Sequence, residues 1–172
     1  VDGYGANTIQ GGDGDDYIFA GVTEDYETPD TAGNLVRGGN GEDAIYVGRG
    51  NDTVFGGNGD DDLESAGGHD RLSGDAGNDY IGFDAAVGSA GVDAYGGAGN
   101  DRLFLDSFRP GAVDLAFGGS GDDGLEIGAA RDGSRLDRAD WLFGGAGYDV
   151  LTYQGPTDTV GLFVDLAANV LI

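Results

Sequence analysis

The chain has 172 residues, of which 37 are glycine, three are proline and none is cysteine. Its 32 Asp and Glu residues face eight Arg and no Lys, so the formal net charge is −24. This balance argues against nucleic-acid binding, which needs a basic surface, and the missing cysteines exclude a disulfide framework and thiolate metal sites.

An acidic, glycine-rich chain could be disordered, but 39% of the residues are hydrophobic and they recur periodically. We find no signal peptide and no apolar run long enough to span a membrane. The chain starts inside a repeat and ends in the apolar run 170–172. We therefore expect one repeat array that belongs to a longer protein.

A nine-residue pattern, G-G-x-G-x-D-x-U-x with U a large aliphatic residue, recurs along the chain. The seven strong matches start at Gly11, Gly38, Gly56, Gly74, Gly96, Gly118 and Gly144, the fourth with Asp75 as its second residue. Windows at Val47 and Ser65 keep spaced glycines and Asp52 or Asp70. A weaker window at the N-terminus has Asn7 where Asp is expected.

Each repeat predicts a tight glycine turn followed by a short strand whose central aliphatic side chain points inward. One repeat cannot bury that side chain alone, so successive turns must stack around a thin core. Two repeats make one coil, and residues 18 apart lie above one another. Asn40-Gly41 and Asn58-Gly59 are also hairpin signals, but antiparallel hairpins do not explain a nine-residue period.

The spacing of the strong windows predicts two different edges. The steps between them are 27, 18, 18, 22, 22 and 26 residues, each one coil with or without an insertion. All seven strong turns therefore fall on one regular edge, and the insertions fall within 20–37, 83–95, 105–117 and 127–143. In these half-coils Asn34, Asp114 and Asp140 stand where the Asp is expected, whereas Val92 stands there with Asp93 beside it.

Regularly spaced Asp residues in glycine turns predict a calcium site. Calcium takes six to eight oxygen ligands from carboxylates and backbone carbonyls, and stacked glycine turns offer both. Magnesium requires a stricter octahedron, and zinc prefers His or Cys, of which the chain has one His and no Cys.

From residue 2 to 152 these windows resemble the repeats-in-toxin (RTX) calcium-binding repeats, which implies an all-β, right-handed parallel β-roll. In that family each ion lies between turns one coil apart. The lower turn contributes the carbonyls of its second and fourth residues and its Asp. The upper turn contributes the carbonyls of its first and third residues and its Asp. On the regular edge the resemblance implies as ligands Gly12, Gly14, Asp16, Gly38, Asn40, Asp43, Gly39, Gly41, Gly56, Asn58, Asp61, Gly57, Gly59, Gly74, Ala76, Asp79, Asp75, Gly77, Gly96, Ala98, Asp101, Gly97, Gly99, Gly118, Ser120, Asp123, Gly119, Gly121, Gly144, Ala146 and Asp149.

On the other edge the resemblance implies one further site, whose ligands are Gly48, Gly50, Asp52, Ser65, Gly67 and Asp70. The total is about seven Ca²⁺ ions, with each interior Asp shared between two of them. Seven ions would bring the charge from −24 to roughly −10. We therefore expect the calcium-free chain to be largely unfolded.

Residues 153–172 break the period and resemble a C-terminal capping segment. Aromatic residues on the strands after the insertions, together with the inserted loops, could bind a glycan or a protein, or the inserts could cover them. The strands after the insertions carry Tyr95, Leu115, Phe117, Trp141 and Phe143, with Phe55 earlier in the chain, and the loop residues are Glu24–Glu27, Arg131, Arg135 and Arg138. His69 has no catalytic partner nearby, and we expect no catalytic residue in this chain.

The resemblance implies a calcium-dependent folding module of a secreted bacterial protein, exported by type I secretion machinery and folded outside the cell. One alternative is an adhesion or carbohydrate-binding module that acts at a cell-surface target through the inserted loops. Another is an accessory module of a secreted enzyme whose catalytic domain lies elsewhere.

Overall fold

The computed structural model describes residues 5–21, 31–84, 91–106, 114–127, 141–153 and 163–165. These ranges form fifteen strands, and none of them contains a helix that could cross a membrane. The strands are β1 (Thr8–Asp13), β2 (Tyr17–Ala20), β3 (Leu35–Asn40), β4 (Ala44–Val47), β5 (Thr53–Asn58), β6 (Asp62–Ser65), β7 (His69–Ala76), β8 (Tyr80–Asp84), β9 (Gly91–Ala98), β10 (Arg102–Asp106), β11 (Leu115–Ser120), β12 (Gly124–Ile127), β13 (Trp141–Ala146), β14 (Val150–Tyr153) and β15 (Phe163–Asp165).

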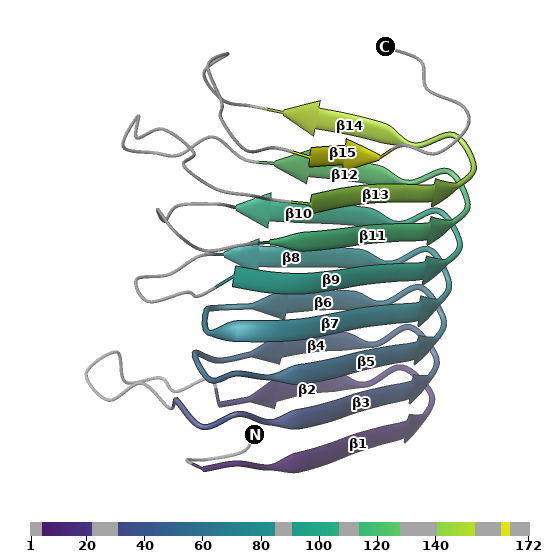
Figure 1. Cartoon of the computed structure of the whole chain (residues 1–172). Coiled ribbons are helices and arrows are strands. Elements are labelled where there is room, and N and C mark those ends of the chain that lie inside the picture. Colours follow the sequence, from purple (N-terminus) through teal and green to yellow (C-terminus); the bar gives the residue numbers. More distant parts are fainter. Residues whose placement is uncertain are drawn as a thin grey trace.

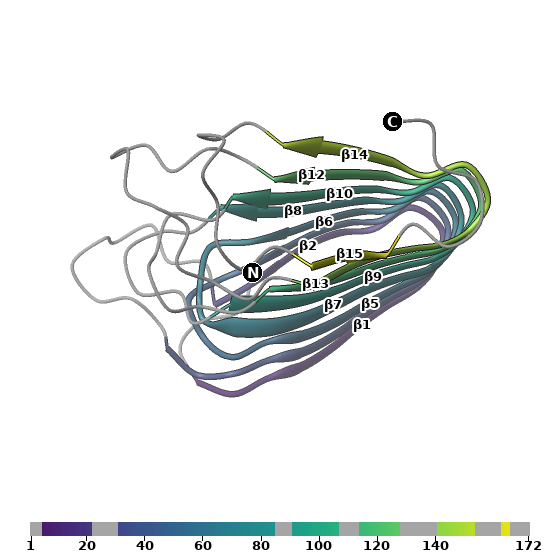
Figure 2. The ribbon, with the colours of Figure 1, turned by 45° about the horizontal axis from the view of Figure 1, so that its top comes forward.

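The strands alternate between two sheets that face each other (Figures 1 and 2). The eight odd-numbered strands form one sheet, here sheet A, and the seven even-numbered strands form the other, sheet B. Every neighbouring pair within a sheet is parallel and follows the order of the chain. This confirms the parallel β-roll and shows that the antiparallel hairpin alternative is wrong.

The register follows the spacing of the repeats. Leu35 pairs with Thr53 and Thr53 pairs with Arg71, which are steps of one 18-residue coil. Asp93 pairs with Leu115 after an insertion, and the pairing still aligns the two glycine turns that follow. Insertions therefore leave the stacking of the strong turns unchanged.

All seven strong turns link a sheet A strand to the next sheet B strand, and they lie along one edge (Figure 1). The longer connections link sheet B back to sheet A, which confirms the predicted two-edged design. The predicted loop residues Glu24–Glu27, Arg131, Arg135, Arg138 and Asp140 lie outside the described residues.

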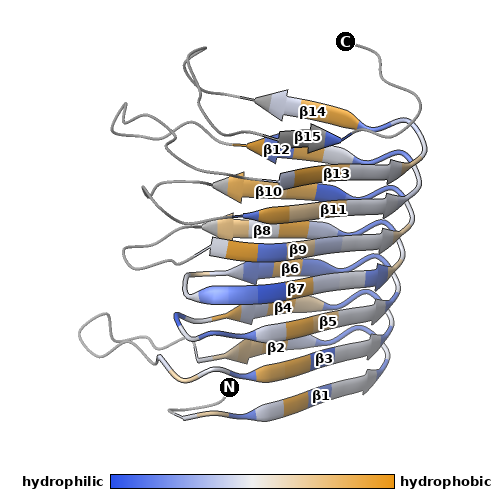
Figure 3. Ribbon diagram, viewed as in Figure 1, coloured by the Kyte–Doolittle hydropathy of each residue, from blue (hydrophilic) through white to orange (hydrophobic). Residues whose placement is uncertain are grey.

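The core is one side chain deep on each sheet. Val36, Val54 and Leu72 of sheet A are buried with Ile45 and Leu63 of sheet B, and the same positions repeat along the roll. Figure 3 shows the hydrophobic positions of neighbouring strands lying beside one another. Each such side chain contributes about 2 kcal/mol on burial, which is modest against the entropy lost by the long glycine turns.

The C-terminal strand β15 extends sheet A by pairing in parallel with β13. It lies in the segment predicted as a cap from residue 153 onward. That boundary and the capping role stay predictions.

Candidate metal centre

The sixth residue of each strong turn is an Asp whose side chain points into the roll at the regular edge. From Asp43 onward these carboxylates are almost completely buried, and Asp16 in the first coil is half-buried. They occur once per coil because the turns stack in register. The ladder they form consists of Asp16, Asp43, Asp61, Asp79, Asp101, Asp123 and Asp149.

From Asp43 onward, one oxygen of each carboxylate supports the turn below it. The backbone N–H of Asp43 donates to Oδ1 of Asp61 at 2.9 Å, and that of Asp61 donates to Oδ1 of Asp79 at 2.9 Å. The same bond joins every neighbouring pair from Asp16 to Asp149, at 2.8 to 3.1 Å. The Oδ1 atoms therefore tie each coil to the next.

The other oxygen, Oδ2, is buried in all seven Asp residues and has no hydrogen-bond donor among the described residues. A buried carboxylate oxygen without a donor or a cation is costly, by roughly 1 to 3 kcal/mol or more. Seven such atoms in one row indicate that each step of the ladder is suited to a cation.

In five of the seven turns, those of Asp16, Asp43, Asp61, Asp101 and Asp123, Oδ2 lies close to the same space as a backbone carbonyl of the next coil. A Cβ placed on Gly38 would collide with Oδ2 of Asp43 and would lie 2.6 Å from the carbonyl oxygen of Gly56. The same arrangement repeats at Gly11, where the oxygens belong to Asp16 and Gly38. Two acceptor oxygens thus converge on a space that a glycine leaves open, and this arrangement suits a hard cation.

The carbonyls of the second and fourth residues point toward the turn above. A Cβ on Gly57, where φ is 124°, would collide with the carbonyl oxygen of Gly39, and a Cβ on Gly59 would collide with that of Gly41. The carbonyl of the third residue points toward the turn below, because the carbonyl of Asn58 accepts the N–H of Gly41 in the preceding coil at 2.8 Å. These directions place the carbonyl oxygens predicted as calcium ligands between the same pair of turns. Their assignment as ligands stays a prediction.

The electrostatics of the ladder also suit a cation. Burial first, and then the negative charges of Asp43, Asp60 and Asp75, raise the pKa of Asp61 to about 6. Burial likewise raises the pKa of Asp79, Asp101 and Asp123 to about 6. The described residues contain no group of three or more Asp, Glu or His side chains arranged around one point. A bound ion would therefore depend on backbone carbonyls as well as carboxylates.

The opposite edge carries a less regular ladder. The N–H of Asp52 donates to Oδ1 of Asp70 at 2.7 Å, and the N–H of Asn34 donates to Oδ1 of Asp52 at 2.6 Å. The hydroxyl of Ser65 donates to Oδ2 of Asp70, a contact that the repeat pattern did not predict. Burial raises the pKa of Asp70 to about 7. The next position of this ladder is occupied by Val92, which is fully buried. Because valine has no carboxylate, the ladder lacks an acidic ligand there.

The regular edge also carries a second hydrogen-bond ladder on its outside, which the repeat pattern did not predict. The fifth residue of a turn accepts the N–H of its counterpart in the next coil through its side chain, as Asp60 does for Asn78 at 2.7 Å. Asn78 does the same for Asn100, and Asn100 for Asp122, both at 2.8 Å. The frequent Asp, Asn or Glu at the fifth position of the repeat is the sequence feature that could have predicted this ladder.

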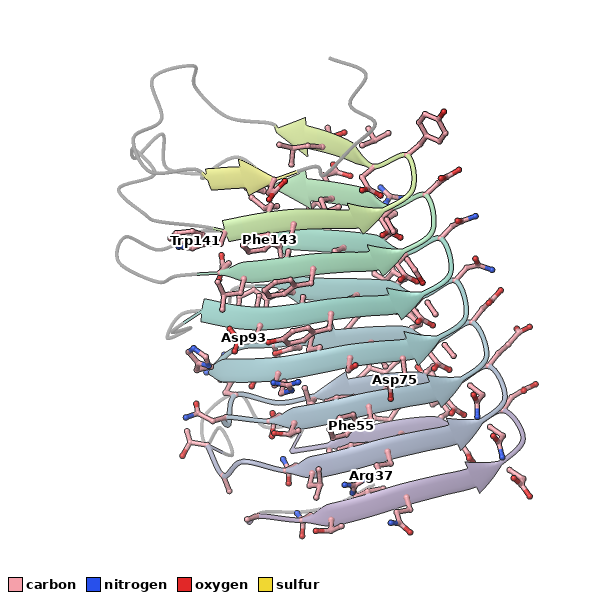
Figure 4. All side chains as sticks on the ribbon, turned by 45° about the vertical axis from the view of Figure 1, so that its right-hand side comes forward. Arg37, Phe55, Asp75, Asp93, Trp141 and Phe143 are labelled. Carbon is pink, nitrogen blue, oxygen red and sulfur yellow. The ribbon has the colours of Figure 1, made fainter. Side chains whose placement is uncertain are left out.

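The aromatic residues of sheet A stack on one another along the roll. Tyr95 and Phe117 have ring centroids 5.1 Å apart and an interplanar angle of 3°, and Phe117 and Phe143 lie 4.7 Å apart at 4°. The guanidinium of Arg71 lies 4.4 Å from the centroid of Tyr95, and Trp141 lies beside Phe143 (Figure 4). Ring faces used in this way are not offered to a sugar, so glycan binding stays a prediction that this stacking does not favour.

His69, the first residue of β7, is exposed.

A family model described as RTX calcium-binding nonapeptide repeat (4 copies) matches residues 1–26, 37–72, 55–85, 82–109 and 136–152. Together these matches cover more than half of the chain. No curated protein and no solved structure matches the chain.

Proposed function

This chain belongs to the family of RTX calcium-binding nonapeptide repeats, and from that premise we propose that it is a calcium-dependent folding module of a secreted protein. Calcium ions would bind between successive turns of the regular edge, with one further site between the turns of Asp52 and Asp70. The observation that carries this proposal is the row of seven buried Oδ2 atoms without a donor.

The proposed sites couple ion binding to folding. Their ligands come from turns 18 or more residues apart, so no complete site exists in the extended chain. The charge of −24 and the thin core oppose compaction until cations neutralise the ladder. Calcium therefore binds the folded roll and not the unfolded chain, and this selective binding stabilises the roll.

We also propose that this coupling serves export. A chain that stays loose in a calcium-poor cytosol can be threaded through type I secretion machinery, and calcium outside the cell then drives folding. Family membership supports this role. Membership of this repeat family also supports an accessory or structural module.

Equilibrium dialysis of the full chain against calcium, with tenfold excess magnesium as competitor, tests the proposed sites. We expect about seven calcium ions per chain and little displacement by magnesium. Binding of one ion or none, or equal binding of both metals, would contradict the proposal.

A further inference from the structure

Asp75 stands where the other strong turns have a glycine with positive φ. Its φ is 72°, and it is the one non-glycine residue with positive φ in the described part of the chain. The equivalent glycines Gly39, Gly57 and Gly97 have φ between 122° and 133°. A side chain in this region strains the backbone, and such strain often accompanies a functional role.

The carboxylate of Asp75 is held in one place. The hydroxyl of Ser73, two residues earlier on β7, donates to its Oδ1 at 2.6 Å. Ser73 is itself buried on the outer face of sheet A, between Phe55 and Tyr95 in the register. Figure 4 shows Asp75 closer to the regular edge than Asp93, so its charge lies beside the turns.

Asp75 lies in one of the two turns that form a proposed calcium site. It pairs with Gly57 in the register and stands between Gly74 and Ala76, so it belongs to the upper of the turns that start at Gly56 and Gly74. Its side chain is exposed, unlike the buried carboxylates of Asp61 and Asp79 in the same pair of turns. A negative charge fixed in this turn attracts a divalent cation bound between the two turns.

We propose that Asp75 is an affinity-determining residue. Its carboxylate, held by Ser73, strengthens calcium binding between the turns of Gly56 and Gly74 through its charge, without coordinating the ion. This inference rests on the proposed function and adds a residue whose side chain the repeat pattern does not assign. Asp75 strains the backbone, but its charge raises the calcium affinity, which a glycine at this position cannot do.

The test compares the wild-type chain with D75N, D75G and E42Q by urea unfolding over a range of calcium concentrations in 0.1 M KCl. D75N keeps an acceptor for Ser73 and removes the charge. E42Q removes one exposed charge from a turn of the same edge and is the matched control. We expect the equilibrium constant for calcium-coupled folding to fall by roughly two- to fivefold in D75N relative to E42Q.

Repeating the series in 1 M KCl separates charge from structure, because the screening length falls from about 10 Å to about 3 Å. The difference between D75N and wild type in the equilibrium constant for calcium-coupled folding should then disappear. The constant for D75G should exceed that of wild type, because glycine relieves the backbone strain. If D75N matches E42Q at low salt, or if its deficit persists at high salt, the role of Asp75 is refuted. If calcium does not raise the urea midpoint of wild type, the proposed function itself fails.

Discussion

From Asp43 onward, the two oxygens of each ladder Asp have separate roles. Oδ1 accepts the N–H of the turn below, as Asp61 does for Asp43, and holds the coils in register. Oδ2 lies buried without a donor and is the atom that needs a cation. An amide could keep the first role and lose the second, so Asp-to-Asn changes separate structure from ion binding.

We predict that D61N weakens two adjacent calcium sites, because Asp61 lies between the turns of Asp43 and Asp79. The expected loss is about 2 kcal/mol of unfolding free energy in calcium, with lower ion stoichiometry by dialysis. D60N is the matched control, because Asp60 is adjacent, exposed and able to keep its bond to Asn78 as an amide. Equal losses in D61N and D60N would show that position six has no special role.

At the scale of the strand and turn, the repeat pattern predicted most of the structure. Positions of the strands and turns follow from the nine-residue period, because each turn needs glycine and each strand needs one inward aliphatic. The pattern could not predict the bond between Ser65 and Asp70 or the orientation of the Tyr95, Phe117 and Phe143 rings. Those depend on side-chain rotamers and on neighbours that lie a full coil away.

The close stacking of turns predicts how glycine replacements differ. Gly57 and Gly12 have almost the same φ, 124° and 122°, but a Cβ on Gly57 would collide with the carbonyl of Gly39, whereas a Cβ on Gly12 meets nothing within 4 Å. G12A therefore carries the cost of strain alone, about 1 to 3 kcal/mol. G57A should be less stable than G12A in urea unfolding with calcium. Equal stabilities would mean that the turns are not packed this closely.

At the scale of the whole molecule, charge and core size together decide whether the chain folds. The core is one side chain deep on each sheet, and the ladder places like charges in neighbouring coils. A thin core with buried, unneutralised carboxylates is not expected to offset the loss of chain entropy. Calcium is therefore part of the folded structure in this account.

Protons should partly replace calcium as neutralising partners. The pKa of Asp61, Asp79, Asp101 and Asp123 rises from 3.8 to about 6 in the roll, so the calcium-free fold binds protons more tightly than the unfolded chain. Their contribution to stability is fully present below about pH 4 and is lost as the pH rises through about 6. Calcium-free protein should therefore show more β signal at pH 4 than at pH 8. A larger signal at pH 8 would contradict this electrostatic account.

The most direct test of calcium-coupled folding is a far-UV circular dichroism titration of the chelated chain at neutral pH, with magnesium as the control. We predict little β signal in chelator and a cooperative gain on addition of calcium but not of magnesium. Full β signal already present in chelator would contradict the account, because the roll would then be stable without any cation.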